Sequence, residues 1–186
     1  MFNKIIVIAC HTSSENKLIT LMNNLKFIHK EYDMVFIVNS TEFKGDIERY
    51  IDKDEFVKDN YIINDFKEDR RIPGLKNLYI SYEDNTKHLC HKKWYDCLNK
   101  KILDKLKYEI ITLTNDSFLI INDLPVINSL KDRDCEMLGF IDSYEIKYHI
   151  PDWYRIYSQL GIKNWMKFYE DNINNCNSFQ DMINVM

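Results

Sequence analysis

The chain has 186 residues, a net charge of −4 at pH 7, and hydrophobic and charged fractions of 45% and 29%. This composition is typical of a soluble globular protein, and we expect residues 1–186 to form a single domain. The acidic balance gives no electrostatic support to a nucleic-acid partner, and the lack of any run of 18 apolar residues excludes a transmembrane helix. Five cysteines at irregular spacing, with no signal peptide at the N-terminus, predict reduced thiols and a cytoplasmic location.

The first part of the chain alternates strands and helices. Residues 4–10 form a continuous apolar run, which predicts a central strand. Thr12, with a glutamate three residues later, has the form of a capping box, so we expect an amphipathic helix to begin there. A second strand is predicted over residues 34–38, and it ends in Asn39 and Ser40. This unit is typical of the opening of a nucleotide-binding α/β domain, although it has neither a dinucleotide-binding glycine loop nor a P-loop.

The middle of the chain mixes charged segments with short apolar runs. We expect helices over residues 45–53 and 86–106 and strands over residues 61–64 and 78–81, with a charged loop at residues 66–74. No repeat, linker or low-complexity segment divides this region, in line with a single domain.

Histidine and cysteine residues gather at the start of the later of these helices. His88, Cys90, His91 and Cys97 are candidate zinc ligands, but their spacing matches no zinc finger. Cys90 and Cys97 share a helical face with Trp94, which is the pattern that core packing produces. Packing is therefore favoured over zinc binding.

The most informative stretch follows residue 108. Residues 110–113 are β-branched and apolar, as in a strand covered on both faces, and the run ends in Asn115, Asp116 and Ser117. Ligands of open α/β sheets collect outside the carboxyl ends of the strands. A carboxylate flanked by an amide and a hydroxyl has the chemistry to hold a divalent cation and the phosphates that it bridges. The alternative is an ordinary Asx-type turn, since all three residues are common turn formers.

Further elements complete the predicted sheet. We expect a helix over residues 124–131 and a strand over residues 136–141, which stops in the polar Asp142. The pattern as a whole predicts an α/β fold with a mostly parallel central sheet and helices on both faces.

The aromatic tail has a helical pattern. Trp153, Tyr157 and Leu160 fall on one helical face, which predicts a helix that packs on the core. Gly161 is a suitable stop for this helix, and Asn164 is a suitable cap for a second, shorter helix.

Several motifs follow one another in a characteristic order. They are Leu-Thr-Asn-Asp-Ser at 113–117 after a hydrophobic strand, Leu-Gly-Phe-Ile-Asp-Ser at 138–143, His149, and an aromatic segment at 153–158 that is expected to be helical. This order resembles the rhamnan synthesis protein F family, glycosyltransferase-like proteins that build rhamnose-containing polysaccharides. The strongest similarity covers about residues 108–170.

The similarity is looser upstream. It includes a strand that ends in His11, a strand that ends in Asn-Ser, and Asn85 before the helix that carries Trp94. The chain departs from the family after Asn85, where Lys87 and Leu89 stand in the region that usually carries a glycine and an aspartate. By this comparison a donor-binding carboxylate is missing.

The resemblance implies a GT-A-like (Rossmann-type) fold in which a sugar nucleotide lies across the carboxyl ends of the first strands. It implies that Asp116 binds Mn²⁺ or Mg²⁺ on the diphosphate, a Lewis-acid role. His149 is implied as a second metal ligand or a diphosphate contact, with a surface or capping histidine as the alternative. Asp142 and Asp152 are the candidates for general base on an acceptor hydroxyl.

The resemblance and the strand-end chemistry together define a candidate set of donor-binding residues. For Thr12 the alternative role is helix capping, and for the others it is turn formation. The set is His11, Thr12, Asn39, Ser40, Asn85, Asn115 and Ser117.

Three hypotheses of function follow. The first is a metal-assisted glycosyltransferase that moves a sugar, such as rhamnose or another deoxysugar, from a UDP-, GDP- or dTDP-sugar to a glycan or glycoprotein acceptor. The second is a non-catalytic GT-A-like partner in a glycan-assembly complex, and the third is a metal-dependent phosphohydrolase that uses Asp116, Asp142 and His149. The expected protein partners are a second copy of the chain or another transferase.

Overall fold

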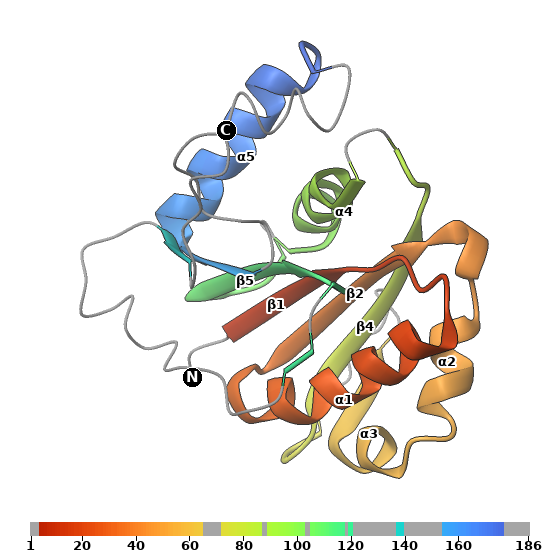
Figure 1. The fold of residues 1–186 in the computed structure, drawn as a ribbon. Helices are drawn as coiled ribbons and strands as arrows, with labels where there is room; N and C mark the ends of the chain where they lie inside the picture. The colour runs from red at the N-terminus through yellow and green to blue at the C-terminus, as the bar shows by residue number, and fades with distance from the viewer. Residues whose placement is uncertain are drawn as a thin grey trace.

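The computed structural model describes residues 4–64, 72–86, 89–102, 105–117, 119–120, 137–139 and 154–176. Within these residues, a single sheet of seven strands has the order β3-β4-β2-β1-β5-β7-β6 (Figure 1). The strands are β1 (Lys4–Ala9), β2 (Met34–Ser40), β3 (Tyr61–Asn64), β4 (Lys76–Glu83), β5 (Ile110–Asn115), β6 (Met137–Gly139) and β7 (Tyr154–Ser158). The helices are α1 (Glu15–Glu31), η1 (Thr41–Phe43), α2 (Asp46–Ile51), α3 (Glu55–Asn60), α4 (Leu89–Cys97), the π-helical turn η2 (Leu98–Ile102) and α5 (Gln159–Ile173).

The sheet is mostly parallel. Each neighbouring pair among β3, β4, β2, β1 and β5 is parallel, whereas β7 runs antiparallel to both β5 and β6. Strand β1 lies between β2 and β5, so the predicted central position of this strand is confirmed. Its last residue, Ala9, pairs with Asn115 at the end of β5. The polar residues that follow these two strands are therefore brought to the same edge of the sheet.

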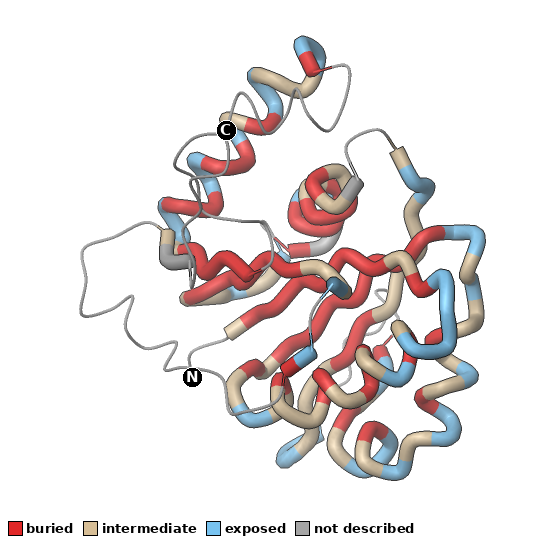
Figure 2. Tube along the Cα trace, in the orientation of Figure 1, coloured by how far each residue is buried: buried red, intermediate tan, exposed pale blue. Residues whose placement is uncertain are grey.

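Two hydrophobic cores lie on opposite faces of the sheet. Helices α1, α2 and α3 cover one face, and α4 and α5 cover the other (Figure 1). Strand β1 contributes Ile6 and Ile8 to the first core and Ile5 and Val7 to the second. This double coverage is why its sequence is uniformly apolar, and Figure 2 shows β1, β2 and β5 buried along almost their whole length. The predicted α/β class, with helices on both faces, is confirmed.

Helix α1 packs as predicted but begins later. The residues expected at helical spacing, Leu18 to Ile28, form its buried face. Its N-cap is Ser14, so the predicted capping box at Thr12 is wrong. The Thr12 hydroxyl instead accepts a hydrogen bond of 2.8 Å from the side-chain amide of Asn39, and Thr12 is only 2% exposed. Thr12 therefore bonds to Asn39 at the end of β2 and does not cap α1.

The segment 154–158 is a strand, so the predicted helix with Trp153, Tyr157 and Leu160 on one face is wrong. Strand β7 pairs antiparallel with β5. Tyr154 belongs to the core under α1, whereas Tyr157 belongs to the core under α5, as the two-residue period of a strand requires. Leu160 is 57% exposed. The backbone hydrogen bonds that β5 offers along its edge decide the conformation of a sequence that is compatible with either element.

A single helix follows β7 in place of the two that the sequence predicts. The N-cap of α5 is Ser158, whose hydroxyl accepts a hydrogen bond of 3.1 Å from the amide of Gly161. Gly161 therefore lies in the first turn of α5 and does not end a helix. Asn164 lies within α5 and does not cap one. Trp165 and Tyr169 are buried on the face of α5 that packs against the sheet.

The other predicted elements vary in outcome. The helix expected over residues 86–106 is divided into α4 and η2, and α3 was not predicted. Trp94 of α4 is fully buried, and its indole nitrogen donates to the carbonyl of Thr114 at 2.8 Å. The helix expected over 124–131 and most of the loop at 66–74 lie outside the described residues.

No helix in the described part of the chain is long and apolar enough to cross a membrane.

Candidate functional site

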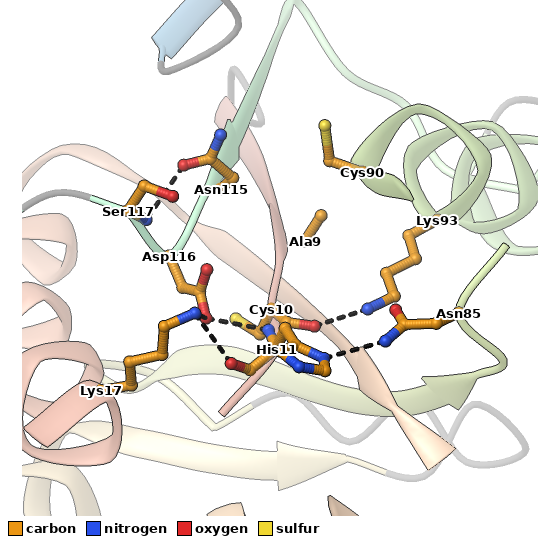
Figure 3. A pocket seen from close by; sticks show the side chains of 10 residues that line it. All are labelled: Ala9, Cys10, His11, Lys17, Asn85, Cys90, Lys93, Asn115, Asp116 and Ser117. Carbon is orange, nitrogen blue, oxygen red and sulfur yellow. Dashed lines mark hydrogen bonds and ion pairs between the residues drawn. The ribbon is translucent and has the colours of Figure 1, made fainter. Parts of the chain in front are cut away.

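A pocket of about 370 Å³ opens at the carboxyl ends of β1 and β5 (Figure 3). Its walls come from the ends of these strands, the loop after β4, the start of α1, and α4. The lining residues are Ala9, Cys10, His11, Lys17, Asn85, Cys90, Lys93, Asn115, Asp116 and Ser117. The position agrees with the edge at which ligands of open α/β sheets collect.

Asp116 lies in the wall of this pocket, held from one side. Its Oδ2 atom accepts a hydrogen bond of 2.8 Å from the backbone amide of His11 and lies 3.3 Å from the ammonium nitrogen of Lys17. The backbone amide of Asp116 in turn donates to the carbonyl of Ala9 at 3.2 Å. These contacts tie the residue after β5 to the end of β1. Both side-chain contacts of Asp116 within the described residues are made by Oδ2, and its side chain is only 8% exposed.

Asn115 and Ser117 flank Asp116. The side-chain oxygen of Asn115 accepts a hydrogen bond of 3.0 Å from the backbone amide of Ser117. This bond forms the Asx-type turn that the sequence offers as the alternative to a metal site. Both residues also line the pocket. The turn and the pocket are compatible, because the turn is what directs the three polar residues away from the buried strand.

A chain of hydrogen bonds runs from Lys93 to His11. The ammonium group of Lys93 donates to the Ser40 hydroxyl at 2.7 Å, and that hydroxyl donates to the side-chain oxygen of Asn85 at 3.0 Å. The amide nitrogen of Asn85 lies 2.9 Å from Nδ1 of His11. The same nitrogen of His11 also lies 3.0 Å from the Ser40 hydroxyl and 3.3 Å from a carboxylate oxygen of Glu42. Three residues predicted from separate strand ends are thus joined at one site.

Lys93 is the most buried charged side chain of the pocket. It is 3% exposed, and its ammonium group also donates to the carbonyl of Cys10 at 2.6 Å. Burial lowers the pKa of Lys93 below its ordinary value of 10.5. Burial, reinforced by the negative charge of Asp116, raises the pKa of the Cys10 thiol well above its ordinary range. Cys10 is therefore a neutral part of the wall.

Thr12 and Asn39 lie beneath the pocket and do not line it. Both are almost fully buried. Besides the bond between their side chains, the backbone amide of Thr12 donates to the side-chain oxygen of Asn39 at 3.3 Å. The pair fixes the backbone just after His11, so its place in the structure is that of a support for the loop.

Two pocket residues with charge, Lys17 and Lys93, were missed by sequence reasoning. For Lys93 a signal exists, because it falls at helical spacing from Cys90 and Cys97, and so lies on the apolar face of its helix. A lysine on an apolar face is unusual and marks a candidate functional group. Lys17 has no such signal, since a lysine in the first turn of an exposed helix is ordinary.

Three predicted site residues, Asp142, Asp152 and His149, lie outside the described residues. Among the residues that the structure does describe, no group of three or more histidine, cysteine or acidic side chains is placed to hold a metal ion. The pocket does present the oxygen donors that Mg²⁺ and Mn²⁺ prefer, in Asp116, Asn115 and Ser117. This donor set fits a divalent cation in chemical type, with one carboxylate as its charged member.

Comparison with known proteins bears on the fold of the chain. No protein-family model matches the chain, and a search of curated proteins finds no match. Among solved structures, the chain is similar to the 4-diphosphocytidyl-2C-methyl-D-erythritol synthase from Anaerococcus prevotii DSM 20548, with a TM-score of 0.54 and 15% sequence identity. The similarity covers 93% of this chain and 77% of that one. The likeness is one of fold. It agrees with the mostly parallel, Rossmann-type α/β class found above.

Proposed function

We propose that the protein is a nucleotide-sugar-dependent glycosyltransferase of the rhamnan synthesis protein F type. It would transfer a sugar, such as rhamnose or another deoxysugar, from a UDP-, GDP- or dTDP-sugar to a glycan or glycoprotein acceptor. The observation that carries the proposal is the pocket at the carboxyl ends of β1 and β5, in which Asp116 lies 3.3 Å from Lys17 and shares the lining with Lys93. A carboxylate and cations at this edge of an open α/β sheet suit a nucleotide diphosphate.

The pocket residues have distinct roles in this proposal. Asp116, with Asn115 and Ser117, would hold Mn²⁺ or Mg²⁺, and a bound ion supplies charge neutralisation at the leaving diphosphate. His11 and Asn85 would contact the nucleoside, since both line the pocket and are joined at 2.9 Å. Asp142 and Asp152 remain the candidates for general base. The name of the structurally similar protein describes a synthase of a diphosphocytidyl compound, which supports a nucleotide ligand for this fold.

Binding of nucleotide sugars tests the proposal. We expect a UDP-, GDP- or dTDP-sugar with Mn²⁺ to stabilise the protein, and a site saturated at about 100 times its dissociation constant adds about 2.7 kcal/mol to the free energy of unfolding. The variant Asp116→Asn should lose most of this stabilisation. Asp171→Asn is the matched control, because Asp171 is exposed on α5 and does not line the pocket. The proposal fails if none of the three sugar nucleotides stabilises the wild-type protein.

A non-catalytic partner in glycan assembly is the second candidate. The ion pair between Lys17 and Asp116 favours it, because an ammonium group already occupies one of the two carboxylate oxygens at which a metal would bind. The measurement that separates the two is turnover. A protein that binds a sugar nucleotide, shows neither transfer nor donor hydrolysis, and co-purifies with another transferase would support the partner role.

A further inference from the structure

Lys93 is a buried cation whose direct partners are neutral. Its ammonium group donates to a backbone carbonyl, that of Cys10, and to a hydroxyl, that of Ser40. No carboxylate is within salt-bridge distance of Lys93 in the described part of the chain, although Asp116 and Glu42 act on it at longer range. Burying an ammonium group without an anionic partner costs free energy. The arrangement suits a group whose counter-ion is a ligand.

Two lysines, Lys93 and Lys17, line the pocket. Lys93 is part of its lining, and Figure 3 shows Lys17 and Lys93 approaching from opposite sides of the Cys10–His11 segment. Lys17 is tied to Asp116 and also donates to the carbonyl of His11 at 2.9 Å. The described lining therefore presents two ammonium groups and one carboxylate. The excess positive charge favours an anionic ligand between them.

Each ammonium group has donor capacity beyond its contacts with the described residues. An ammonium group has three N–H donors, and Lys93 uses two of them, for Cys10 and Ser40. The carbonyl of Cys10 and the hydroxyl of Ser40 hold the lysine at the wall, so that little side-chain entropy remains to be lost when a ligand binds. The oxygens of a diphosphate carry negative charge at neutral pH, and hydrogen bonds between charged groups are among the strongest in proteins.

We propose that Lys93, together with Lys17, forms a diphosphate-binding subsite that binds phosphate groups even in the absence of a metal ion. The identification of its ligand as the diphosphate of a sugar nucleotide rests on the proposed function, whereas the binding of phosphate groups can be measured alone. Asp116 would then hold Lys17 in place when the pocket is empty of ligand.

Calorimetric titration of the full chain with inorganic pyrophosphate, in buffer that contains EDTA, tests this subsite. We expect wild-type protein to bind pyrophosphate and Lys93→Met to bind it at least about tenfold more weakly, which equals about 1.4 kcal/mol. Lys93→Arg, which keeps the charge and the donors, should retain measurable binding.

Lys92→Met is the matched control on the same helix. Lys92 is outside the pocket lining and pairs with Asp96, which retains a contact with Lys100 when Lys92 is replaced. Its pyrophosphate affinity should stay within about twofold of wild type, because Lys92 does not line the pocket. The inference is overturned if wild-type protein does not bind pyrophosphate at millimolar concentration, or if Lys93→Met binds it as wild type does. If Lys93→Met does not fold, Lys17→Met decides, and an unchanged affinity overturns the inference.

The outcome is separable from that of the proposed function. Pyrophosphate binding in EDTA that depends on Lys93, without stabilisation by any sugar nucleotide, would support the subsite and contradict the glycosyltransferase. Sugar-nucleotide binding that requires Mn²⁺ and is unaffected by Lys93→Met would do the reverse.

Discussion

Three hydroxyl groups meet inside the core beneath the strand that carries Asp116. Tyr32, at the end of α1, is fully buried, and its hydroxyl bonds to Thr112 of β5 at 2.7 Å and to the hydroxyl of Tyr154 of β7. Burial raises the pKa of both tyrosines, so the hydroxyls are neutral at physiological pH. The cluster joins α1 to the antiparallel pair β5–β7.

Replacing Tyr32 with phenylalanine removes the central hydroxyl of this cluster. Two hydrogen bonds are lost, and the buried hydroxyl of Thr112 loses a partner, so we expect a loss of about 2–3 kcal/mol in the free energy of unfolding. Tyr154→Phe leaves the bond between Tyr32 and Thr112 intact and should cost about 1 kcal/mol. Tyr50→Phe is the control, because its hydroxyl bonds to Glu15 at the surface and its loss should cost less than about 0.5 kcal/mol.

Equilibrium unfolding in urea measures these differences. With an m-value of about 2 kcal/mol/M, Tyr32→Phe should lower the midpoint by about 1–1.5 M and Tyr50→Phe by at most about 0.25 M. Equal midpoints for Tyr32→Phe and Tyr50→Phe would refute the buried cluster. They would also contradict the contact between Tyr32 and Tyr154, which joins β7 to α1.

Three further predictions test other parts of the structure. Thr12→Val should cost about 1–2 kcal/mol of stability in the same assay, because it breaks the buried bond to Asn39, whereas Ser14→Ala should be almost neutral, since Ser14 caps α1 without a side-chain hydrogen bond. The reverse order, with the larger loss for Ser14→Ala, would contradict the buried bond between Thr12 and Asn39. Leu160→Ser should change stability by less than about 0.5 kcal/mol, because the side chain is mostly exposed, and a core-sized loss would contradict its place in α5. The stability of wild type relative to Lys93→Met should rise as the pH increases toward 10.5. The reason is that the lowered pKa of Lys93 makes the folded state bind fewer protons than the unfolded chain in that interval, and a difference independent of pH would contradict it.

Elements with a strong local pattern were predictable. Strands β1 and β5 are buried on both faces, so their sequences are continuous apolar runs with no alternation of polar and apolar residues. Such a run can be recognised from the sequence alone. The buried face of α1 follows from its 3.6-residue spacing. The position of Asp116 at the edge of the sheet was also predictable, because a polar residue that follows a buried parallel strand lies at the carboxyl end of that strand.

Local patterns failed where a distant partner decides the outcome. Thr12 lies in a sequence typical of a helix cap, but its hydroxyl is hydrogen-bonded to the side chain of Asn39 in β2. Residues 154–158 have a sequence compatible with a helix, but the open edge of β5 supplies backbone partners for a strand.

The chain by itself therefore determined the α/β class, the order of most elements and the strand end that carries the candidate site. Only the tertiary structure brought Lys17 and Lys93 to that site, joined His11 to Asn85 and Ser40, and paired Asp116 with a cation. The physical reason is the range of the interactions. Hydrophobic periodicity acts between residues a few positions apart, whereas the hydrogen bonds and charges of the pocket join segments that are distant in sequence and adjacent only after the sheet has formed.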